Sequence, residues 1–388
     1  MSRLAFFAGW VARNLLRHRL RSALTLAGII VAIVAFGLLR TVVDAWYAGA
    51  EATSAKRLIT RNAVSLVFPL PISYLNRIRQ VAGVATVSYA NWFAGVYIDE
   101  KNFFPQFAIE PKGYLALYPE FVLSSEALSA FLKDQGGAVA GRRLAEQYGW
   151  KVGDVVPLRG TIYPGEWRFV LRGIYTGAEP KIDETNLFFH WNYLNEEQKK
   201  QPGGRQDHTG IYVIGLHRAA EAARVSRDID ALFKNSMAET LTETEKAFQL
   251  GFVAMTEAIL VVVQIVSLFV IAIILAVAAN TMTMTVRERR REYATLKALG
   301  FGSKHVLGLI MGESLFLSVS GGLLGIAMTF PVAKVFAARV GTLFPIFTVS
   351  PTTIALAFGA AGLVGLAAGL FAALGAKESI ASALRDAP

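Results

Sequence analysis

Hydrophobic residues are concentrated in four long stretches near the two ends of the chain, whereas residues 46–250 mix polar and apolar positions as an ordinary globular domain does. The four stretches carry almost no charge and cover residues 23–39, 258–279, 314–332 and 354–376. A bilayer core of about 30 Å needs roughly 20 apolar residues in a helix, because every backbone amide must be satisfied internally. The pattern predicts an α-helical membrane protein with four transmembrane helices and a large α+β extracytoplasmic domain inserted between helices one and two.

Composition and charge support this class and give an orientation. The 388 residues are 54% hydrophobic and only 18% charged, which is too apolar for an ordinary soluble enzyme. Arg13, Arg17, Arg19 and Arg21 precede the first stretch, and a second basic cluster follows the second stretch. Basic residues beside spans are retained in the cytoplasm, so both termini are predicted to lie there. The protein is thus predicted to cross the inner membrane several times, with the large domain in the periplasm. The net charge of +10 is expected to serve topology and contacts with membrane lipid, with no nucleic acid as partner.

These signals predict the following order along the chain. It consists of a cytoplasmic amphipathic helix at 1–21, transmembrane helices at 22–45, 251–282, 304–332 and 351–376, the extracytoplasmic domain at 46–250, a cytoplasmic coupling helix at 283–303, an extracytoplasmic loop at 333–350 and a cytoplasmic tail at 377–388. A cleavable signal peptide ending near Ala50 is the alternative for the first span. The apolar run exceeds the roughly 7 to 15 residues of a signal sequence, which favours a retained helix.

The extracytoplasmic domain shows a mixture of strand and helix patterns. Strands are predicted at 63–68, 168–175 and 211–216, and helices at 72–81, 141–149 and 218–233, with a middle lobe at about 111–200. An aromatic run from Trp92 to Phe107 has two readings: packing in the core, or an apolar face that handles lipid.

No catalytic, cofactor or metal site is predicted. The chain has no cysteine, and its five histidines are scattered along the sequence. It contains no paired carboxylates, nucleophile elbow or HExxH spacing in the outer domain, and no Gly-x-x-x-x-Gly-Lys-Ser/Thr loop anywhere. No nucleotide-binding site is therefore expected on this chain, and a membrane sensor or enzyme remains a less favoured class.

The segment from Val286 to Phe301 is the most informative stretch of the chain. It is rich in strong helix formers, with Gly300 as a left-handed stop and Ser303 as a cap for the next helix. A solvated basic loop would obey topology equally well, but apolar residues on a cytoplasmic turn favour docking of a partner. The predicted docking residues are Arg287, Glu288, Arg289, Arg291, Glu292, Tyr293, Leu296, Lys297, Leu299 and Gly300.

Two acids near span ends, Glu257 and Glu313, are candidates for intramembrane coupling. Glu313 has two readings, an ion pair with an arginine of the coupling helix or a position at the lipid interface. Small-residue pairs can bring helices close together, and here they are expected to pack spans three and four of one protomer, with a dimer contact as the alternative. These pairs are Gly308 and Gly312, Gly321 and Gly325, and Gly365 and Gly369.

The 286–301 segment resembles the coupling region of the MacB and FtsX type (type VII) of ABC transporter permease. Residues 12–28, 141–158 and 376–385 resemble the family's first span entry, its periplasmic core domain and its closing segment. The resemblance implies a dimer with a second, identical or similar permease copy, and a separate ABC ATPase dimer that docks on the coupling helices. It also implies that ATP closure moves the outer domains.

Two functions of this family remain open. One is export of a lipid, lipoprotein, peptide or small molecule, with a membrane-fusion adaptor or periplasmic acceptor as a further partner. The other is FtsX-like mechanotransmission to a periplasmic or cell-wall enzyme. The outer domain, about two hundred residues long, favours the MacB type and export.

Overall fold

The computed structural model describes residues 19–51, 53–179, 181–201, 203–340 and 346–385. The chain forms two compact units, each considered by itself. One comprises Met1–Asp44, Glu257–Arg339 and Phe347–Pro388, and the other comprises Ala45–Thr256 and Val340–Ile346. The amphipathic helix predicted at 1–21 lies outside the described residues up to position 18, and Arg19 already belongs to the first described helix.

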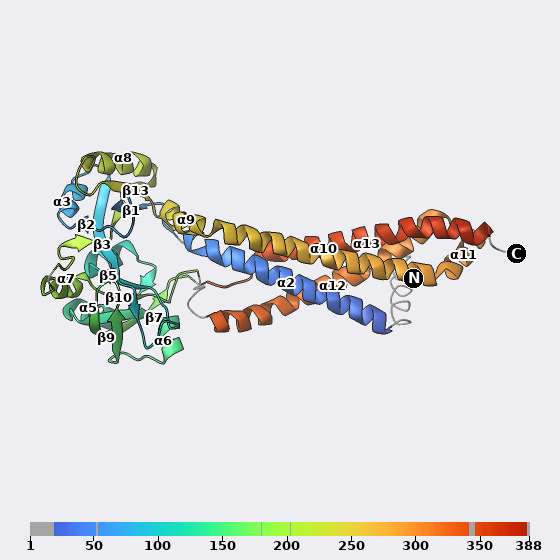
Figure 1. Cartoon of the computed structure of the whole chain (residues 1–388), viewed down its shortest axis with the longest axis horizontal. Coiled ribbons are helices and arrows are strands. Elements are labelled where there is room, and N and C mark those ends of the chain that lie inside the picture. The colour runs from blue at the N-terminus through green and yellow to red at the C-terminus, as the bar shows by residue number, and fades with distance from the viewer. Residues whose placement is uncertain (1–18, 52, 180, 202, 341–345, 386–388) are drawn as a thin grey trace. The chain divides into compact units, whose positions relative to one another are not determined.

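Four long helices build the first unit (Figure 1). They are α2 (Arg19–Glu51), α10 (Glu257–Glu288), α12 (Ser303–Val340) and α13 (Pro351–Arg385). Each contains a stretch long and apolar enough to cross a membrane: Leu20–Ala48, Glu257–Glu288, Ser303–Arg339 and Pro351–Leu374. The four predicted spans are therefore present as helices. α10 starts at Glu257 and ends at Glu288, six residues later at each end than 251–282.

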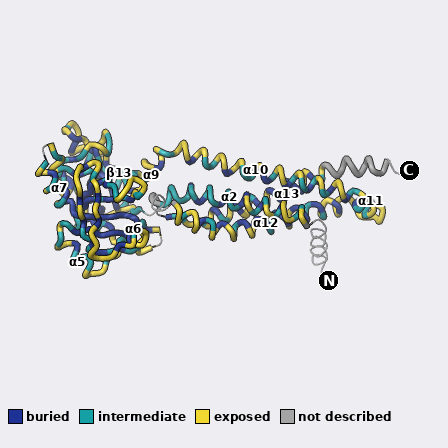
Figure 2. Tube along the Cα trace, turned by 60° about the horizontal axis from the view of Figure 1, so that its bottom comes forward, coloured by how far each residue is buried: buried dark blue, intermediate teal, exposed yellow. Residues whose placement is uncertain are grey.

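Large aliphatic side chains and alanines fill the middle of this helical unit. Ile29 and Ile33 of α2, Ile274 of α10 and Ala361 of α13 are almost completely buried together. Stretches of α10 and α12 are yellow in Figure 2, and large apolar side chains of these helices, such as Phe269 and Phe316, are exposed. Such an outward apolar surface is the arrangement that lipid contact requires.

Two of the three predicted small-residue pairs lie at close helix contacts. A Cβ on Gly321 or Gly325 would come within 2.8 Å of Ile29 or Ile33 of α2, while Gly365 and Gly369 pack against α12. The first pair therefore contacts helix one rather than helix four. Apart from the backbone of its own helix and its chain neighbours, no described atom lies within 4 Å of a Cβ placed on Gly308 or Gly312.

A short helix, α11 (Arg290–Ala298), forms the corner between α10 and α12. It is shorter than the 283–303 predicted, because α10 continues to Glu288. Gly300 has φ +92°, the left-handed conformation predicted for it. Ser303 is the first residue of α12 rather than its cap, and the amide of His305 donates to the carbonyl of Gly302.

The second unit is a domain built on one large mixed sheet. The strands are β1 (Arg57–Asn62), β2 (Leu70–Pro71), β3 (Val84–Trp92), β4 (Gly95–Val96), β5 (Gln106–Ile109), β6 (Phe121–Val122), β7 (Gly137–Gly141), β8 (Val155–Gly160), β9 (Gly165–Gly177), β10 (Leu187–His190), β11 (His208–Thr209), β12 (Ile211–Leu216) and β13 (Thr240–Thr244). The order in the large sheet is β13-β1-β12-β3-β5-β10-β7-β9-β8-β4, and β6 pairs with β9. β2 and β11 form a separate two-stranded antiparallel sheet. Strands from residues 111–200 thus belong to the same sheet as those outside that range.

Apolar side chains cover both faces of this sheet. The helices are α3 (Tyr74–Arg79), α4 (Pro111–Leu117), α5 (Ser125–Lys133), α6 (Arg142–Tyr148), α7 (Trp191–Lys199), α8 (Ala222–Leu232) and α9 (Glu245–Met255). Side chains from α3, α6, α7 and α8 join one core cluster, and side chains from α4, α5 and α9 join the other. The alternation of strand residues between two faces explains this division.

The predicted strands at 168–175 and 211–216 lie within β9 and β12, and the predicted helices at 72–81, 141–149 and 218–233 contain α3, α6 and α8. The strand predicted at 63–68 is wrong. The amide of Val64 donates to the Asn62 side chain and the amide of Phe68 to the carbonyl of Ser65, so the chain turns there.

β1 and β13 are the strands nearest in sequence to the long helices α2 and α10, and they are neighbours in the sheet. β1 follows α2, and β13 leads through α9 to α10. They pair antiparallel, with Leu58 opposite Thr244 and Asn62 opposite Thr240. The two ends that connect to the helices therefore lie at the same end of the ladder.

Candidate functional site

The corner between α10 and α12 is organised around a buried arginine. Arg289 is 7% exposed and its guanidinium lies 2.9 Å from the Glu313 carboxylate of α12 and 3.0 Å from Glu292 of α11. The guanidinium also lies 5.4 Å from the centre of the Tyr293 ring. Burial opposes the charge, but Tyr293, Glu313 and Glu292 together hold the pKa of Arg289 above its ordinary value.

Of the two readings of Glu313, the structure therefore contains the ion pair. The carboxylate is 6% exposed, so the pair is largely removed from solvent. A buried pair with additional hydrogen bonds is costly to break, because one partner alone would leave an uncompensated charge. The pair ties α11 to α12 at the corner. Glu257, the other candidate, is the exposed first residue of α10.

Tyr293 is 1% exposed and belongs to the core of the corner. It packs with Met282 and Val286 of α10 and with Val306 and Ile310 of α12. Burial raises the pKa of Tyr293 to about 12. Tyr293 therefore holds the corner together and is unavailable for docking, contrary to the sequence prediction.

The exposed part of the corner is apolar and basic. Leu299 is 71% exposed and Phe301 is 47% exposed. Arg287, Arg291 and Lys304 are exposed as well. We call these five residues the corner surface. Leu296 packs partly against the buried cluster, Lys297 and Glu292 are half-buried, and Gly300 lies exposed at the turn.

A second ion pair links the corner region to the start of α2. Both terminal nitrogens of Arg21 donate to the Glu288 carboxylate, at 2.6 and 2.8 Å. Glu288 is thus held by α2. A polar cavity of about 360 Å³ lies close by, lined by residues that include Thr25, Thr285 and Arg289.

The sheet domain contains a corresponding arrangement at the connected end of β1 and β13. Arg57, 5% exposed, donates from Nε to Glu245 at 2.7 Å and from a terminal nitrogen to Glu120 at 2.5 Å. Its other terminal nitrogen donates to the carbonyl of Leu117, and its guanidinium lies 4.2 Å from the Tyr118 ring centre. Burial opposes the charge of Arg57, but the acids hold its pKa above the ordinary value. We call Arg57, Glu120 and Glu245 the strand clamp.

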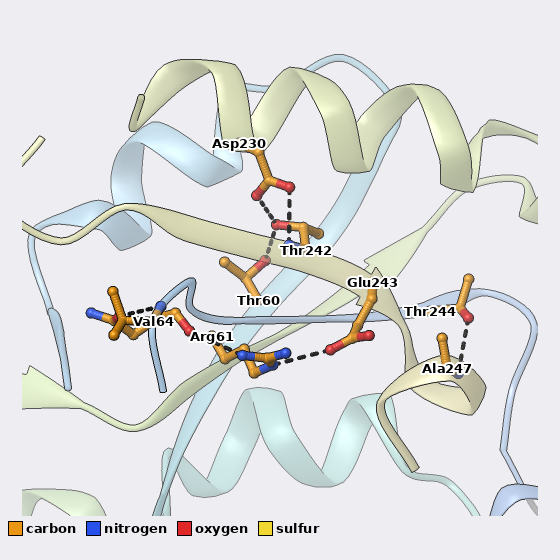
Figure 3. A network of polar contacts seen from close by, with 9 residues as sticks. Thr60, Arg61, Val64, Asp230, Thr242, Glu243, Thr244 and Ala247 are labelled. Atoms are coloured by element: carbon orange, nitrogen blue, oxygen red, sulfur yellow. Dashed lines mark hydrogen bonds and ion pairs between the residues drawn. The ribbon is translucent and has the colours of Figure 1, made fainter. Parts of the chain in front are cut away.

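Further polar contacts join β1 to β13 along the ladder (Figure 3). The hydroxyls of Thr60 and Thr242 lie 2.9 Å apart, and Arg61 donates to Glu243 at 3.1 Å. Asp230 of α8 accepts from both the amide and the hydroxyl of Thr242. The strand then passes directly into α9, which the Thr244 hydroxyl caps by accepting from the amide of Ala247.

Sequence reasoning missed the strand clamp and the Arg21–Glu288 pair. Arg57 and Glu245 are 188 positions apart, and Arg21 and Glu288 are 267 apart. No local pattern predicts pairing at such separations.

Comparisons with known proteins agree with this architecture. Residues 264–378 match the family model described as FtsX-like permease C-terminal. An uncharacterised ABC transporter permease of Methanocaldococcus jannaschii is 26% identical over 349 residues, which are 84% of this chain and 83% of that protein. An uncharacterised ABC transporter permease protein of Mycobacterium tuberculosis is 27% identical over 201 residues, which are 51% of this chain but 22% of that protein.

Two solved structures are similar to parts of the chain. The extracellular domain of the non-canonical ABC-type transporter YknZ from Gram-positive bacteria has a TM-score of 0.35 and 12% identity, and covers 48% of this chain and 100% of that one. A domain assigned to a permease protein from Porphyromonas gingivalis has a TM-score of 0.35 and 12% identity, with 50% and 92% covered. By sequence, residues 264–378 are thus similar to the FtsX-like permease C-terminal domain, and the chain is similar to ABC transporter permeases, the type that its sequence resembles.

Proposed function

We propose that the chain is the permease subunit of an ABC transporter, with the corner surface in the cytoplasm and the sheet domain on the other side of the inner membrane. A separate ATPase dimer binds ATP and Mg and docks on the corner surfaces of two permease copies. This chain itself performs no catalysis and holds no cofactor. Its task is to convert closure of the ATPase into movement of the sheet domain.

The observation that carries the proposal is the combination of a rigid interior and an apolar exterior at the corner. Arg289, Glu313 and Tyr293 fix α11 to the long helices, so a force on the corner moves those helices rather than bending a loop. Leu299 and Phe301 are exposed among basic side chains, outside the buried cluster. Large apolar side chains left exposed on a segment that also carries exposed basic residues are typical of a protein interface.

Movement of the helices would reach the sheet domain through its connected strands. β1 follows α2 directly, and β13 continues through α9 into α10. The strand clamp joins the ends of these two strands with a buried ion pair of 2.7 Å. A displacement shared by α2 and α10 is therefore expected to move the sheet as one body.

We favour export of an apolar cargo over FtsX-like control of a wall enzyme. The sheet domain contains a cavity lined by aromatic side chains. Such a cavity suits a bound ligand, whereas a domain that only transmits force needs none. A membrane-fusion adaptor or a periplasmic acceptor is the expected further partner. Activation of a purified wall hydrolase by the chain, with no movement of cargo, would favour the alternative.

Replacing both apolar residues of the corner surface tests the docking step. The double variant Leu299→Asp with Phe301→Asp, co-expressed with the ATPase, is expected to lose recruitment by about thirtyfold or more, as for an interface hot spot of about 2 kcal/mol. The measurement is the ratio of ATPase to permease after purification of the tagged chain in nanodiscs.

Val152→Asp is the matched control, because Val152 is 60% exposed but lies in the sheet domain. It should leave the ratio unchanged. An unchanged ratio in the double variant, with the helices still folded, would contradict docking at the corner.

A further inference from the structure

The sheet domain contains a cavity of about 410 Å³ beside α4, within the usual size range of small-molecule sites. Seven of the described aromatic side chains line it: Trp46, Trp92, Phe107, Tyr114, Tyr118, Phe121 and Phe188. Phe107, Tyr114, Phe121 and Phe188 are in ring contact with one another or with Trp92. The wall is therefore a continuous aromatic surface rather than scattered rings.

The aromatic run of the sequence supplies part of this wall. Trp92 of β3 pairs in register with Phe107 of β5, and both point to the cavity side of the sheet. Phe93 and Phe104 are completely buried in the core cluster on the opposite side. Both readings of the run therefore apply, each to different residues. Trp92 is 38% exposed, whereas a large aromatic side chain that only packs in a core is usually more buried.

The charged side chains around the cavity leave no excess positive charge. Two basic residues, Arg57 and Lys181, and three acidic residues, Glu120, Asp183 and Glu245, line it, so the formal sum is 2 − 3 = −1. Arg57 is paired with both glutamates, and Lys181 lies 2.9 Å from Glu179. Among the described lining residues, an anionic head group would therefore meet no cation that lacks an acidic partner.

The rim of the cavity includes residues that adjoin the apolar helices. Ala45 and Trp46 line it and are also part of the Leu20–Ala48 stretch that is apolar enough to cross a membrane. Ile346, 9% exposed, also lines the cavity and precedes α13. The cavity lining thus shares two residues with a stretch apolar enough to cross a membrane, which favours a ligand that concentrates in the bilayer.

We propose that this cavity binds one amphiphile without net negative charge, such as an uncharged or zwitterionic single-chain lipid. Its apolar part lies against Trp92, Phe107 and Phe121, and its polar part is bound by the amide side chains of Asn186 and Gln249, which also line the cavity. The inference rests on the proposed export function only in identifying the bound amphiphile as the cargo. Binding itself needs no ATP.

The test uses the full chain in nanodiscs and a lysophosphatidylcholine with a photoreactive acyl chain. Saturable labelling is expected in peptides that contain cavity residues. Trp92→Ala is expected to raise the probe concentration for half-maximal labelling about tenfold or more, whereas Trp92→Phe, which keeps an aromatic ring, should shift it much less. A photoreactive fatty acid, anionic at neutral pH, should label the cavity weakly at the same concentration.

Phe68→Ala is the matched control, because Phe68 is 52% exposed and lies outside the cavity lining. Hydrogen exchange of β3 in each variant separates lost binding from lost folding. The proposal is wrong if labelling is confined to the long helices, if Trp92→Ala labels like the unaltered chain, or if the fatty acid labels the cavity equally well. ATPase recruitment is independent of this result, so its loss with labelling intact would count against the permease function alone.

Discussion

Removal of the strand-clamp arginine is predicted to loosen the two connected strands selectively. Arg57→Met keeps an aliphatic chain of similar length but leaves the Glu245 carboxylate, whose side chain is 6% exposed, without its cation. Breaking a buried pair from one side costs about 3–5 kcal/mol, because the remaining charge stays desolvated. At about 1.4 kcal/mol for each factor of ten, the opening equilibrium of β1 and β13 should rise by about a hundredfold or more.

Amide hydrogen exchange of the full chain in nanodiscs measures that opening strand by strand. Arg61→Met is the matched control on the same strand, since the side chains of its pair with Glu243 are 22% and 24% exposed. A partly exposed pair contributes about 1 kcal/mol or less. The double variant Arg57→Met with Glu245→Gln should recover part of the loss, because it removes the stranded charge. Equal exchange in Arg57→Met and Arg61→Met would refute the central place of the clamp.

Two further predictions concern other buried groups. Arg289→Met should lower the free energy of unfolding of the helical unit by about 3–5 kcal/mol, because Glu313 is left buried, whereas Arg287→Met at an exposed position should have little effect; thermal unfolding in nanodiscs compares them. Burial lowers the pKa of His190, so the folded domain keeps it neutral where the unfolded chain, with a pKa of about 6.5, binds a proton. The neutral His190 therefore contributes fully to the stability of the domain above about pH 6.5, and this contribution is lost as the pH falls below that value. Each unit by which the pKa in the folded state lies below 6.5 corresponds to about 1.4 kcal/mol of stability. Faster hydrogen exchange of β10 at low pH, absent in His190→Gln, checks this, and equal pH dependence in both proteins would contradict it.

The long apolar helices could be predicted from sequence because their signal is local and strong. A run of some twenty apolar residues has few other structures available. The left-handed Gly300 could be predicted for the same reason, since its conformation depends on its own missing side chain. The strand at 63–68 could not, because Val64 and Val67 have strand-forming side chains but lie exposed in a turn set by Asn62 and Ser65.

The candidate site could be predicted only in part. The charged and apolar composition of the corner marked it as a contact segment, but composition does not say which face of α11 meets the other helices. The sequence pattern therefore predicts Tyr293 on the docking surface although it is buried, and it does not predict Phe301 there although that side chain is exposed. Arg57 could not be predicted as a site residue, because its partner Glu245 lies 188 positions away along the chain.

The shared exit of β1 and β13 makes the sheet domain respond differently to two kinds of helix movement. If α2 and α10 travel together, all rungs of the ladder between Leu58 and Asn62 and their partners are carried along unstressed. If the two helices separate, the hydrogen bonds between β1 and β13 would break one after another from the end that connects to the helices. The ion pair of Arg57 and Glu245 lies at that end and would be strained first. Under the proposed function, the domain would therefore resist movement of α2 and α10 in the same direction and would yield when the two helices move apart.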